Sequence, residues 1–326
     1  MNRWKNALLL LAVVLSLIGS VRATSAEPAA NSKPQDLSPR AKLERAHRVV
    51  FLGDSITYAG QYVAYVETWL LTQPFGRELN VIDIGLPSET VSGLSEDGHA
   101  GGAFPRPNLH ERLQRVLATA KPDLVFACYG MNCGIYLPFD EERFAKYQQG
   151  IEQLRESVRG AGAEIVHITP PVHDDQQNPG ATGYDSVLAR YSDWLIHQRE
   201  HGWTVIDLHT PMAAELANER RQSKAFTFQP DGVHPNEAGH WLIAQQLLIA
   251  LGEPRAADWK SPAEMCEALK LPVEILPLVQ ERTNVLRDAY LSAAGHQRPG
   301  MPAGLPIAEA EAKAEKLTAQ IRQLAP

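Results

Sequence analysis

The 326-residue chain has few cysteines, no cluster of positive charge and no long apolar run, and each shortage excludes a class of protein. Three cysteines are too few for a disulfide-built scaffold. The formal net charge is -7 and no basic patch stands out, so nucleic acid is not an expected partner. The apolar run at residues 7–18 is short for a membrane span, and no cysteine follows it to carry a lipid anchor.

The N-terminal segment has the pattern of a secretory signal. Two basic residues precede the apolar run, and small residues follow it near position 23. This predicts a signal peptide over residues 1–23, with an uncleaved N-terminal anchor as the alternative. We therefore expect export to the periplasm or the outside of the cell, with no stable membrane insertion after cleavage. Residues 24–40 are rich in Ala, Pro and Ser and are expected to form a flexible leader.

The middle of the chain alternates short apolar runs with helical patterns, which predicts an α/β fold. The runs are rich in β-branched and aromatic residues, as in strands buried on both faces. Such alternation is typical of a parallel sheet with helices on both faces. The expected strands are 48–52, 80–84, 123–129, 164–169 and 204–208. The expected helices are 60–73, 108–120, 140–161, 183–201 and 211–221, followed by a last core helix that starts at Pro235.

A change of pattern after Gly252-Glu253-Pro254 marks the end of this unit. Residues 261–294 predict one or two helices, and residues 307–324, rich in Ala, Glu and Lys, predict a terminal one. A loop rich in Gly and Pro separates them. We expect a main α/β domain over 41–252 and a C-terminal helical extension over 253–326.

A serine follows the first expected strand, in Gly53-Asp54-Ser55. There it would lie at the carboxyl edge of the sheet, where open α/β folds bind ligands. By itself this pattern also fits a serine that caps the following helix.

An acid and a histidine occur together in Asp231-Gly232-Val233-His234. His234 could take the proton of Ser55 as a general base, while Asp231 holds the other ring nitrogen. A nucleophile, a base and an orienting acid are the set required for acyl transfer through a serine ester. The alternative is that Asp231 and His234 only stabilise a surface turn.

Two more residues end expected strands at the same edge. Gly85 follows the second strand, and its bare backbone N–H could approach a substrate oxygen closely. Asn132 follows the third, and its amide could donate to the same oxygen. With the N–H of Ser55 they would form a three-donor oxyanion hole. Each could also be an ordinary turn residue.

These motifs together resemble the SGNH (GDSL) hydrolases, over residues 47–252. The resemblance rests on Gly53-Asp54-Ser55, Gly85, Gly130-x-Asn132 and Asp231-x-x-His234. It implies a doubly wound, flavodoxin-like fold with a five-stranded parallel sheet. It also implies ester hydrolysis through a serine acyl-enzyme, with no cofactor and no metal. The implied nucleophile is Ser55, the base His234 and its orienter Asp231, with Gly85 and Asn132 completing the oxyanion hole.

The chain departs from the family pattern at two positions. Asp83 stands where the family often has asparagine, and Cys133 stands where it often has aspartate. Cys133 lies close in sequence to Cys128 and could pair with it, although Cys128 also fits as a small apolar strand residue, which we favour. The Gly-x-Ser-x-Gly signature of α/β-hydrolases is absent from the sequence, which disfavours that fold.

Other polar residues are candidates for contact with substrate. Asp54 adjoins the serine, and His173, in His173-Asp174-Asp175, follows the fourth strand. That acidic stretch could instead bind a metal or form a plain polar loop. His296 and Arg298 lie in the C-terminal loop and could hold an anionic or sugar group, or be solvated.

We therefore expect an exported serine esterase that acts on carboxylic esters. The favoured substrates are O-acetyl or short acyl groups on a carbohydrate, either a small molecule or a polysaccharide. Lipid or thioester acyl hydrolysis is an alternative within the same mechanism. A non-catalytic carbohydrate-binding protein on the same fold is an alternative of another class.

Overall fold

The computed structural model describes residues 38–325. The predicted signal peptide (1–23) lies outside the described residues, as does the predicted leader (24–40) except at its end. There, Ser38 caps a short helix, α1 (Pro39–Leu43), and its hydroxyl accepts a backbone N–H at 3.2 Å. The predicted leader is therefore too long at its C-terminal end.

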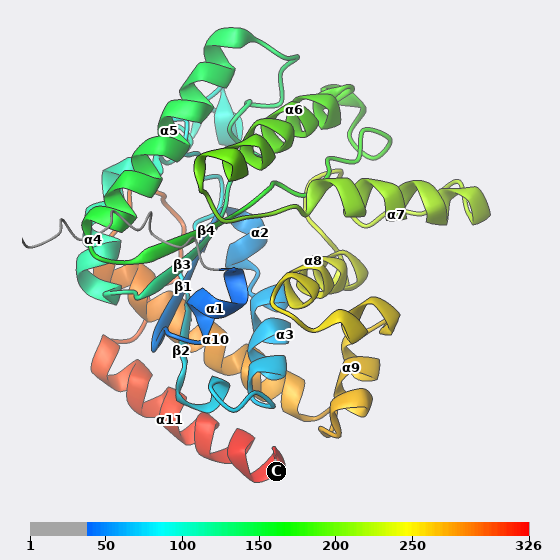
Figure 1. Ribbon diagram of the computed structural model, residues 1–326. Coiled ribbons are helices and arrows are strands. Elements are labelled where there is room, and N and C mark those ends of the chain that lie inside the picture. The colour runs from blue at the N-terminus through cyan, green and yellow to red at the C-terminus, as the bar shows by residue number, and fades with distance from the viewer. Residues whose placement is uncertain (1–37, 326) are drawn as a thin grey trace, which may run out of the picture. The chain divides into compact units, whose positions relative to one another are not determined.

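Within the described chain, five parallel strands form one sheet in the order β2-β1-β3-β4-β5, which confirms the predicted doubly wound, flavodoxin-like fold (Figure 1). The side chains of the central strands are buried almost throughout, because helices cover both faces. Four strands match their predicted ranges closely, and the fifth is shorter than predicted. The strands are β1 (Arg48–Gly53), β2 (Asn80–Asp83), β3 (Leu124–Cys128), β4 (Glu164–Ile168) and β5 (Val205–Ile206).

The longer helices form where the sequence pattern predicted them. They are α3 (Gln61–Leu70), α4 (Leu109–Ala120), α5 (Glu141–Gly160), α6 (Tyr184–His197), α7 (His209–Gln222) and α8 (Glu237–Ala250). On one face of the sheet α3 packs against α8, and on the other α4 packs against α5 (Figure 1). Short 3-10 turns connect some of these elements: η1 (Gly76–Glu78), η2 (His99–Gly102), η3 (Pro179–Ala181), η4 (Gln198–His201) and η5 (Pro254–Asp258).

One short helix was not predicted, and the last core helix begins two residues later than predicted. A four-residue helix, α2 (Ser55–Tyr58), follows β1 and is too short to give a periodic pattern. The helix expected to start at Pro235 begins at Glu237, because the Asn236 side chain caps it by accepting the Gly239 N–H at 3.0 Å.

The C-terminal helices pack against the sheet unit. They are α9 (Pro262–Leu269), α10 (Ile275–Ala294) and α11 (Ile307–Leu324). Helix α10 contacts α3, α4 and β2, and α11 lies along α10 (Figure 1). Arg282 of α10 forms an ion pair with the buried Glu67 of α3. Arg287 donates to the carbonyl oxygen of Tyr58 at 2.6 Å. The division into a domain and an extension at residue 252 stays a prediction.

All three cysteines are free and buried. Cys128 lies in β3 as a small strand residue, and it does not pair with Cys133. From residue 38 to residue 325, none of the helices is long and apolar enough to cross a membrane.

Candidate active site

Ser55 is the first residue of α2, at the carboxyl edge of the sheet. The cap of this helix is Asp54, whose Oδ1 accepts the Ile56 N–H at 3.0 Å, so the serine hydroxyl is not used as a cap. Gly53 is required for packing, because a Cβ there would lie 2.1 Å from Oγ1 of Thr57. The Gly-Asp-Ser sequence therefore turns the chain sharply from strand to helix and presents the third residue.

The structure brings Ser55, His234 and Asp231 together. Ser55 Oγ lies 2.8 Å from His234 Nε2, and His234 Nδ1 lies 2.7 Å from Asp231 Oδ2. The second oxygen, Asp231 Oδ1, accepts the backbone N–H groups of Val233 at 2.9 Å and His234 at 2.7 Å. Since a carboxylate can only accept, it holds the proton on Nδ1 and leaves Nε2 free to take the serine proton.

The charge of Asp231 is favoured by its surroundings. Partial burial would raise the pKa of Asp231, but hydrogen bonds from the His234 ring and from the backbone N–H groups of His234 and Val233 lower it below its usual value. The carboxylate is thus available to stabilise an imidazolium on His234.

The loop that carries the histidine is held by the loop after β4. Gly232 has φ +84, and a Cβ there would lie 2.5 Å from Cβ of Asn178. Its carbonyl oxygen accepts the Asp174 N–H at 2.8 Å. The buried carboxylate of Asp174 in turn binds Arg220 at 2.6 and 2.7 Å and the Thr227 hydroxyl at 2.6 Å. These contacts fix the position of His234 relative to the sheet.

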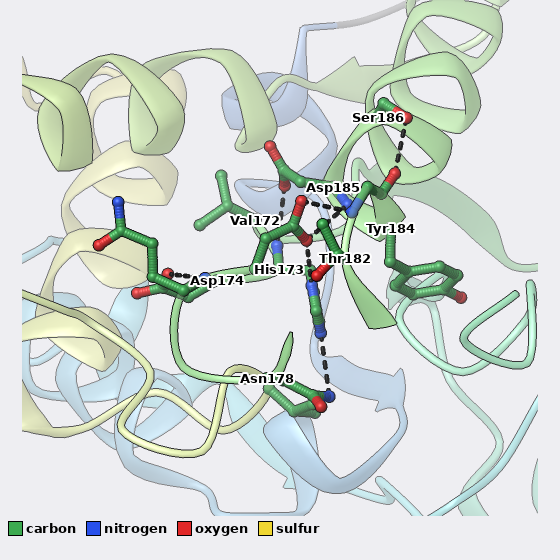
Figure 2. A network of polar contacts seen from close by, with 12 residues as sticks. Val172, His173, Asp174, Asn178, Thr182, Tyr184, Asp185 and Ser186 are labelled. Atoms are coloured by element: carbon green, nitrogen blue, oxygen red, sulfur yellow. Dashed lines mark hydrogen bonds and ion pairs between the residues drawn. The ribbon is translucent and has the colours of Figure 1, made fainter. Parts of the chain in front are cut away.

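His173 belongs to this supporting network (Figure 2). Its side chain is buried, with Nδ1 2.7 Å from Asp175 Oδ1 and Nε2 3.3 Å from Asn178 Nδ2. Its backbone N–H donates to Asp185 Oδ1 at 2.8 Å. Both ring nitrogens are thus engaged within the protein, so the predicted contact of His173 with substrate gains no support. Among the described residues, no group of three or more His, Cys, Asp or Glu side chains is arranged to hold a metal ion.

Asn132 lies in the turn after β3 and is almost fully buried. Its Nδ2 donates to the carbonyl oxygen of Glu89 at 3.1 Å. Its Oδ1 accepts Arg106 Nη1 at 2.9 Å and the Tyr136 hydroxyl at 3.0 Å. Within residues 38–325, the second N–H of the amide has no such partner and can be offered to a substrate oxygen.

The geometry at Gly85 gives a different reason for the glycine than the predicted one. A Cβ at this position would lie 2.3 Å from the backbone nitrogen of Tyr58, so glycine allows α2 to approach the loop after β2. Its N–H donates to Asp83 Oδ1 at 2.8 Å. The predicted role of Gly85 in the oxyanion hole stays a prediction, and it would require this N–H to be shared between Asp83 and substrate.

Three other predicted contacts with substrate also stay predictions. Burial raises the pKa of Asp54 to about 6, and its Oδ1 is engaged at the α2 cap. The Arg298 guanidinium lies 5.2 Å from the ring centre of Phe104, in the loop between β2 and α4. Its Nη1 donates to the carbonyl oxygen of Pro299 at 3.0 Å. Burial lowers the pKa of His296, which favours the neutral ring.

The residues around Asn132 were not predicted from the sequence. Arg106 and Tyr136 touch its Oδ1, and Glu89 lies on its other side, held by Arg112 at 2.6 and 2.7 Å. Arg106, Tyr136 and Glu89 lie in loops, which have no periodic sequence pattern, and Arg112 lies in α4, far from Asn132 in sequence. No motif in a single sequence marks them.

Comparison with known proteins gives one family and several partial likenesses. Residues 51–242, more than half of the chain, match the GDSL-like Lipase/Acylhydrolase family. The diglucosylglycerate octanoyltransferase of Mycolicibacterium hassiacum is 30% identical over 105 residues, which are 30% of this chain and 40% of that protein, so the chain spans less than half of this relative's length.

Solved structures give distant likenesses. Axe2, an acetylxylan esterase from Geobacillus stearothermophilus, is 23% identical with a TM-score of 0.46, over 63% of this chain and 94% of its own. LAE5, an alpha/beta hydrolase enzyme from the metagenome of Lake Arreo in Spain, is 22% identical with a TM-score of 0.48, over 64% and 95% of the two chains.

A serine, a histidine and an aspartate joined by hydrogen bonds at the edge of a parallel sheet have the arrangement of the serine hydrolases. The match over residues 51–242 shows that the chain belongs to the GDSL-like lipase/acylhydrolase family, a class of hydrolases acting on ester bonds. The family predicted from the four motifs is confirmed.

Proposed function

We propose that the protein is a serine esterase that hydrolyses O-acyl esters through an acyl-enzyme on Ser55. The observation that supports the proposal is the pair of consecutive hydrogen bonds that joins Ser55 to His234 and His234 to Asp231, at 2.8 and 2.7 Å. A serine that only capped a helix would not require a hydrogen bond to a histidine that is itself hydrogen-bonded to an aspartate.

The chemistry follows from the positions of the protons. His234 Nε2 takes the hydroxyl proton as Ser55 Oγ attacks the ester carbonyl carbon, and Asp231 stabilises the imidazolium. The carbonyl oxygen becomes an oxyanion, to which the remaining N–H of Asn132 donates. Collapse of the intermediate breaks the bond to the alcohol, which leaves with the proton from His234. Water then repeats the sequence on the acyl-enzyme, releasing the acid and restoring Ser55.

For the substrate we propose short acyl esters on a carbohydrate, met outside the cytoplasm after export. The openness of the triad supports this proposal: the side chains of His234 and Asp231 are 53% and 57% exposed. An ester on a bulky sugar chain can reach such a site. Export rests on the signal pattern of residues 1–23.

Acyl transfer to a sugar is a second candidate. The observation that favours it is the partial likeness to the diglucosylglycerate octanoyltransferase. The same acyl-enzyme would then be released by an alcohol in place of water, and a longer acyl chain would be accepted.

The test is hydrolysis of p-nitrophenyl acetate, butyrate and octanoate by the wild type and by Ser55→Ala in parallel. We expect acetate to be cleaved best, and kcat to fall by roughly 10⁴-fold or more in the variant with its fold retained. Preference for octanoate, with faster turnover when a sugar acceptor is added, would favour transfer. Activity that survives in Ser55→Ala would sink the serine mechanism, and a wild type inactive on all esters would favour the carbohydrate-binding alternative.

A further inference from the structure

The Asn132 amide is fixed in one orientation by partners whose chemistry is unambiguous. An arginine can only donate, so the atom that meets Arg106 Nη1 at 2.9 Å must be the amide oxygen. A backbone carbonyl can only accept, so the atom that meets the Glu89 oxygen at 3.1 Å must be the nitrogen. The Tyr136 hydroxyl adds a second donor to the amide oxygen at 3.0 Å. Asn132 is only 3% exposed, and a 180° flip of its amide would break all three contacts.

Arg106 is itself held on several sides. Glu96 binds it in a two-pronged ion pair, with Nε–Oε2 and Nη2–Oε1 both 2.6 Å. Its guanidinium carbon lies 5.2 Å from the ring centre of Tyr136. The side chain is 6% exposed, so the charge acts on its neighbours with little screening by water.

Tyr136 reaches the amide oxygen from an unfavourable backbone conformation. Ile135 and Tyr136 have φ of 51° and 58°, and a left-handed conformation is rare for a branched residue such as isoleucine. The Tyr136 ring packs against Tyr184 at 4.9 Å and His173 at 5.9 Å between ring centres. Such conformations persist where the surrounding structure imposes them, and they cluster at functional sites.

We infer that Arg106 and Tyr136 are positioning residues that hold and polarise the Asn132 amide as an oxyanion donor. The inference rests on the proposed function. Two hydrogen bonds into Oδ1 stop the amide from rotating and direct its remaining N–H. Donation into Oδ1, one bond of it from a cation, also draws electron density from Nδ2 and strengthens its N–H as a donor. Both residues act through Asn132.

The test compares Arg106→Met, which removes the charge and the donor, with Tyr136→Phe, which removes only a hydroxyl. Because the oxyanion exists only in the transition state, kcat should fall while KM stays nearly constant. For Arg106→Met we expect a loss of at least about tenfold, bounded by the roughly 10²–10³-fold expected for loss of the donor itself. Tyr136→Phe should lose less, since it removes a neutral donor.

Double variants separate positioning from a general structural effect. If Arg106 acts through Asn132, adding Arg106→Met to Asn132→Ala should cost less than about twofold further, because the shared function is already lost. The matched control is Arg255→Met, which removes another ion-paired guanidinium, bound to Glu253 and 63% exposed. Its kcat should equal that of the wild type.

The outcomes are distinguishable from failure of the proposed function. Absence of any Ser55-dependent hydrolysis in the wild type would overturn the proposed function and this inference together. If the wild type hydrolyses the ester and the kcat of Arg106→Met lies within about twofold of the wild-type value, the inference alone is overturned. It is also overturned if the losses from Arg106→Met and Asn132→Ala multiply in full in the double variant. If Arg106→Met fails to fold by circular dichroism, Tyr136→Phe alone and combined with Asn132→Ala decides by the same criteria.

Discussion

The two sides of the site are built in opposite ways. On the histidine side, Asp231 and His234 are three residues apart, exposed to solvent, and bonded to each other and to their own backbone. On the amide side, Asn132 is buried, and its partners Arg106 and Glu89 lie 26 and 43 residues away in sequence. The ring that carries the proton is thus oriented by local hydrogen bonds, in a loop that the segment after β4 holds, whereas the donor that must meet a developing charge is oriented by residues distant in sequence.

The largest effect should come from the histidine side. Asp231→Asn keeps the shape of the side chain. The amide oxygen is needed to accept the two backbone N–H groups, so the amide N–H faces Nδ1 and holds the ring in the wrong tautomer. We expect kcat on p-nitrophenyl acetate to fall about 10⁴-fold, with an unchanged circular dichroism spectrum. A loss below tenfold would mean that the exposed His234 orients itself in solvent, and the comparison of the two sides would fail.

The amide side should give a smaller loss. Asn132→Ala removes one oxyanion donor and should lower kcat roughly 10²–10³-fold. The KM for the same ester should hardly change, because the bond forms only in the transition state. A loss below about tenfold would remove Asn132 from the oxyanion hole and leave the backbone N–H groups as its donors.

The smallest effect is expected on the free energy of unfolding, from the buried carboxyl group of Asp83. Burial raises the pKa of Asp83 to about 7, although the Gly85 N–H and the charges of Arg287 and Arg112 lower it. Among the described residues its Oδ2 has no hydrogen-bond partner. A carboxyl whose pKa is higher in the folded than in the unfolded state holds its proton more tightly when folded. Its contribution to stability is therefore lost as the pH rises from about 4 to about 7.

Asp83→Asn should remove this loss, since an amide can still accept the Gly85 N–H without a charge. At pH 8 we expect the free energy of unfolding to rise by about 1–3 kcal/mol, seen as a Tm higher by several degrees, with little change at pH 4. The exposed Asp97→Asn serves as control and should leave the difference between the two pH values as in the wild type. An equal shift of Tm at both pH values would show that the buried charge is not the cause.

The contrast between the two sides also explains what could be predicted from sequence. The sheet was predictable because buried parallel strands are continuous apolar runs, and the triad because its acid and base lie in one short motif. Helix α2 could not be predicted, since four residues carry no period. Gly85 was identified as a special position, but its packing role could not be predicted, because the sequence does not show that a Cβ there would meet the backbone of Tyr58.

The network around Asn132 was invisible for a related reason. Arg106 follows a loop rich in glycine and is flanked by prolines, so its neighbours suggest a turn and nothing more. The positive φ of Ile135 and Tyr136 contradicts the local preference of both residues. Where tertiary contacts override local preference, a single sequence gives no signal.

The packing of α10 along β2 determines where the chain can be truncated. A strand at the edge of a sheet presents unpaired backbone groups that can pair with another chain. In this protein β2 is such a strand, and α10 packs against it. Arg287 of α10 also donates a hydrogen bond to the carbonyl oxygen of Tyr58, at the end of α2. A shortened version designed from the family match alone would end at residue 242. It would expose the edge of β2 and remove the hydrogen bond from Arg287 to the end of α2. The smallest unit worth expressing therefore extends through α10.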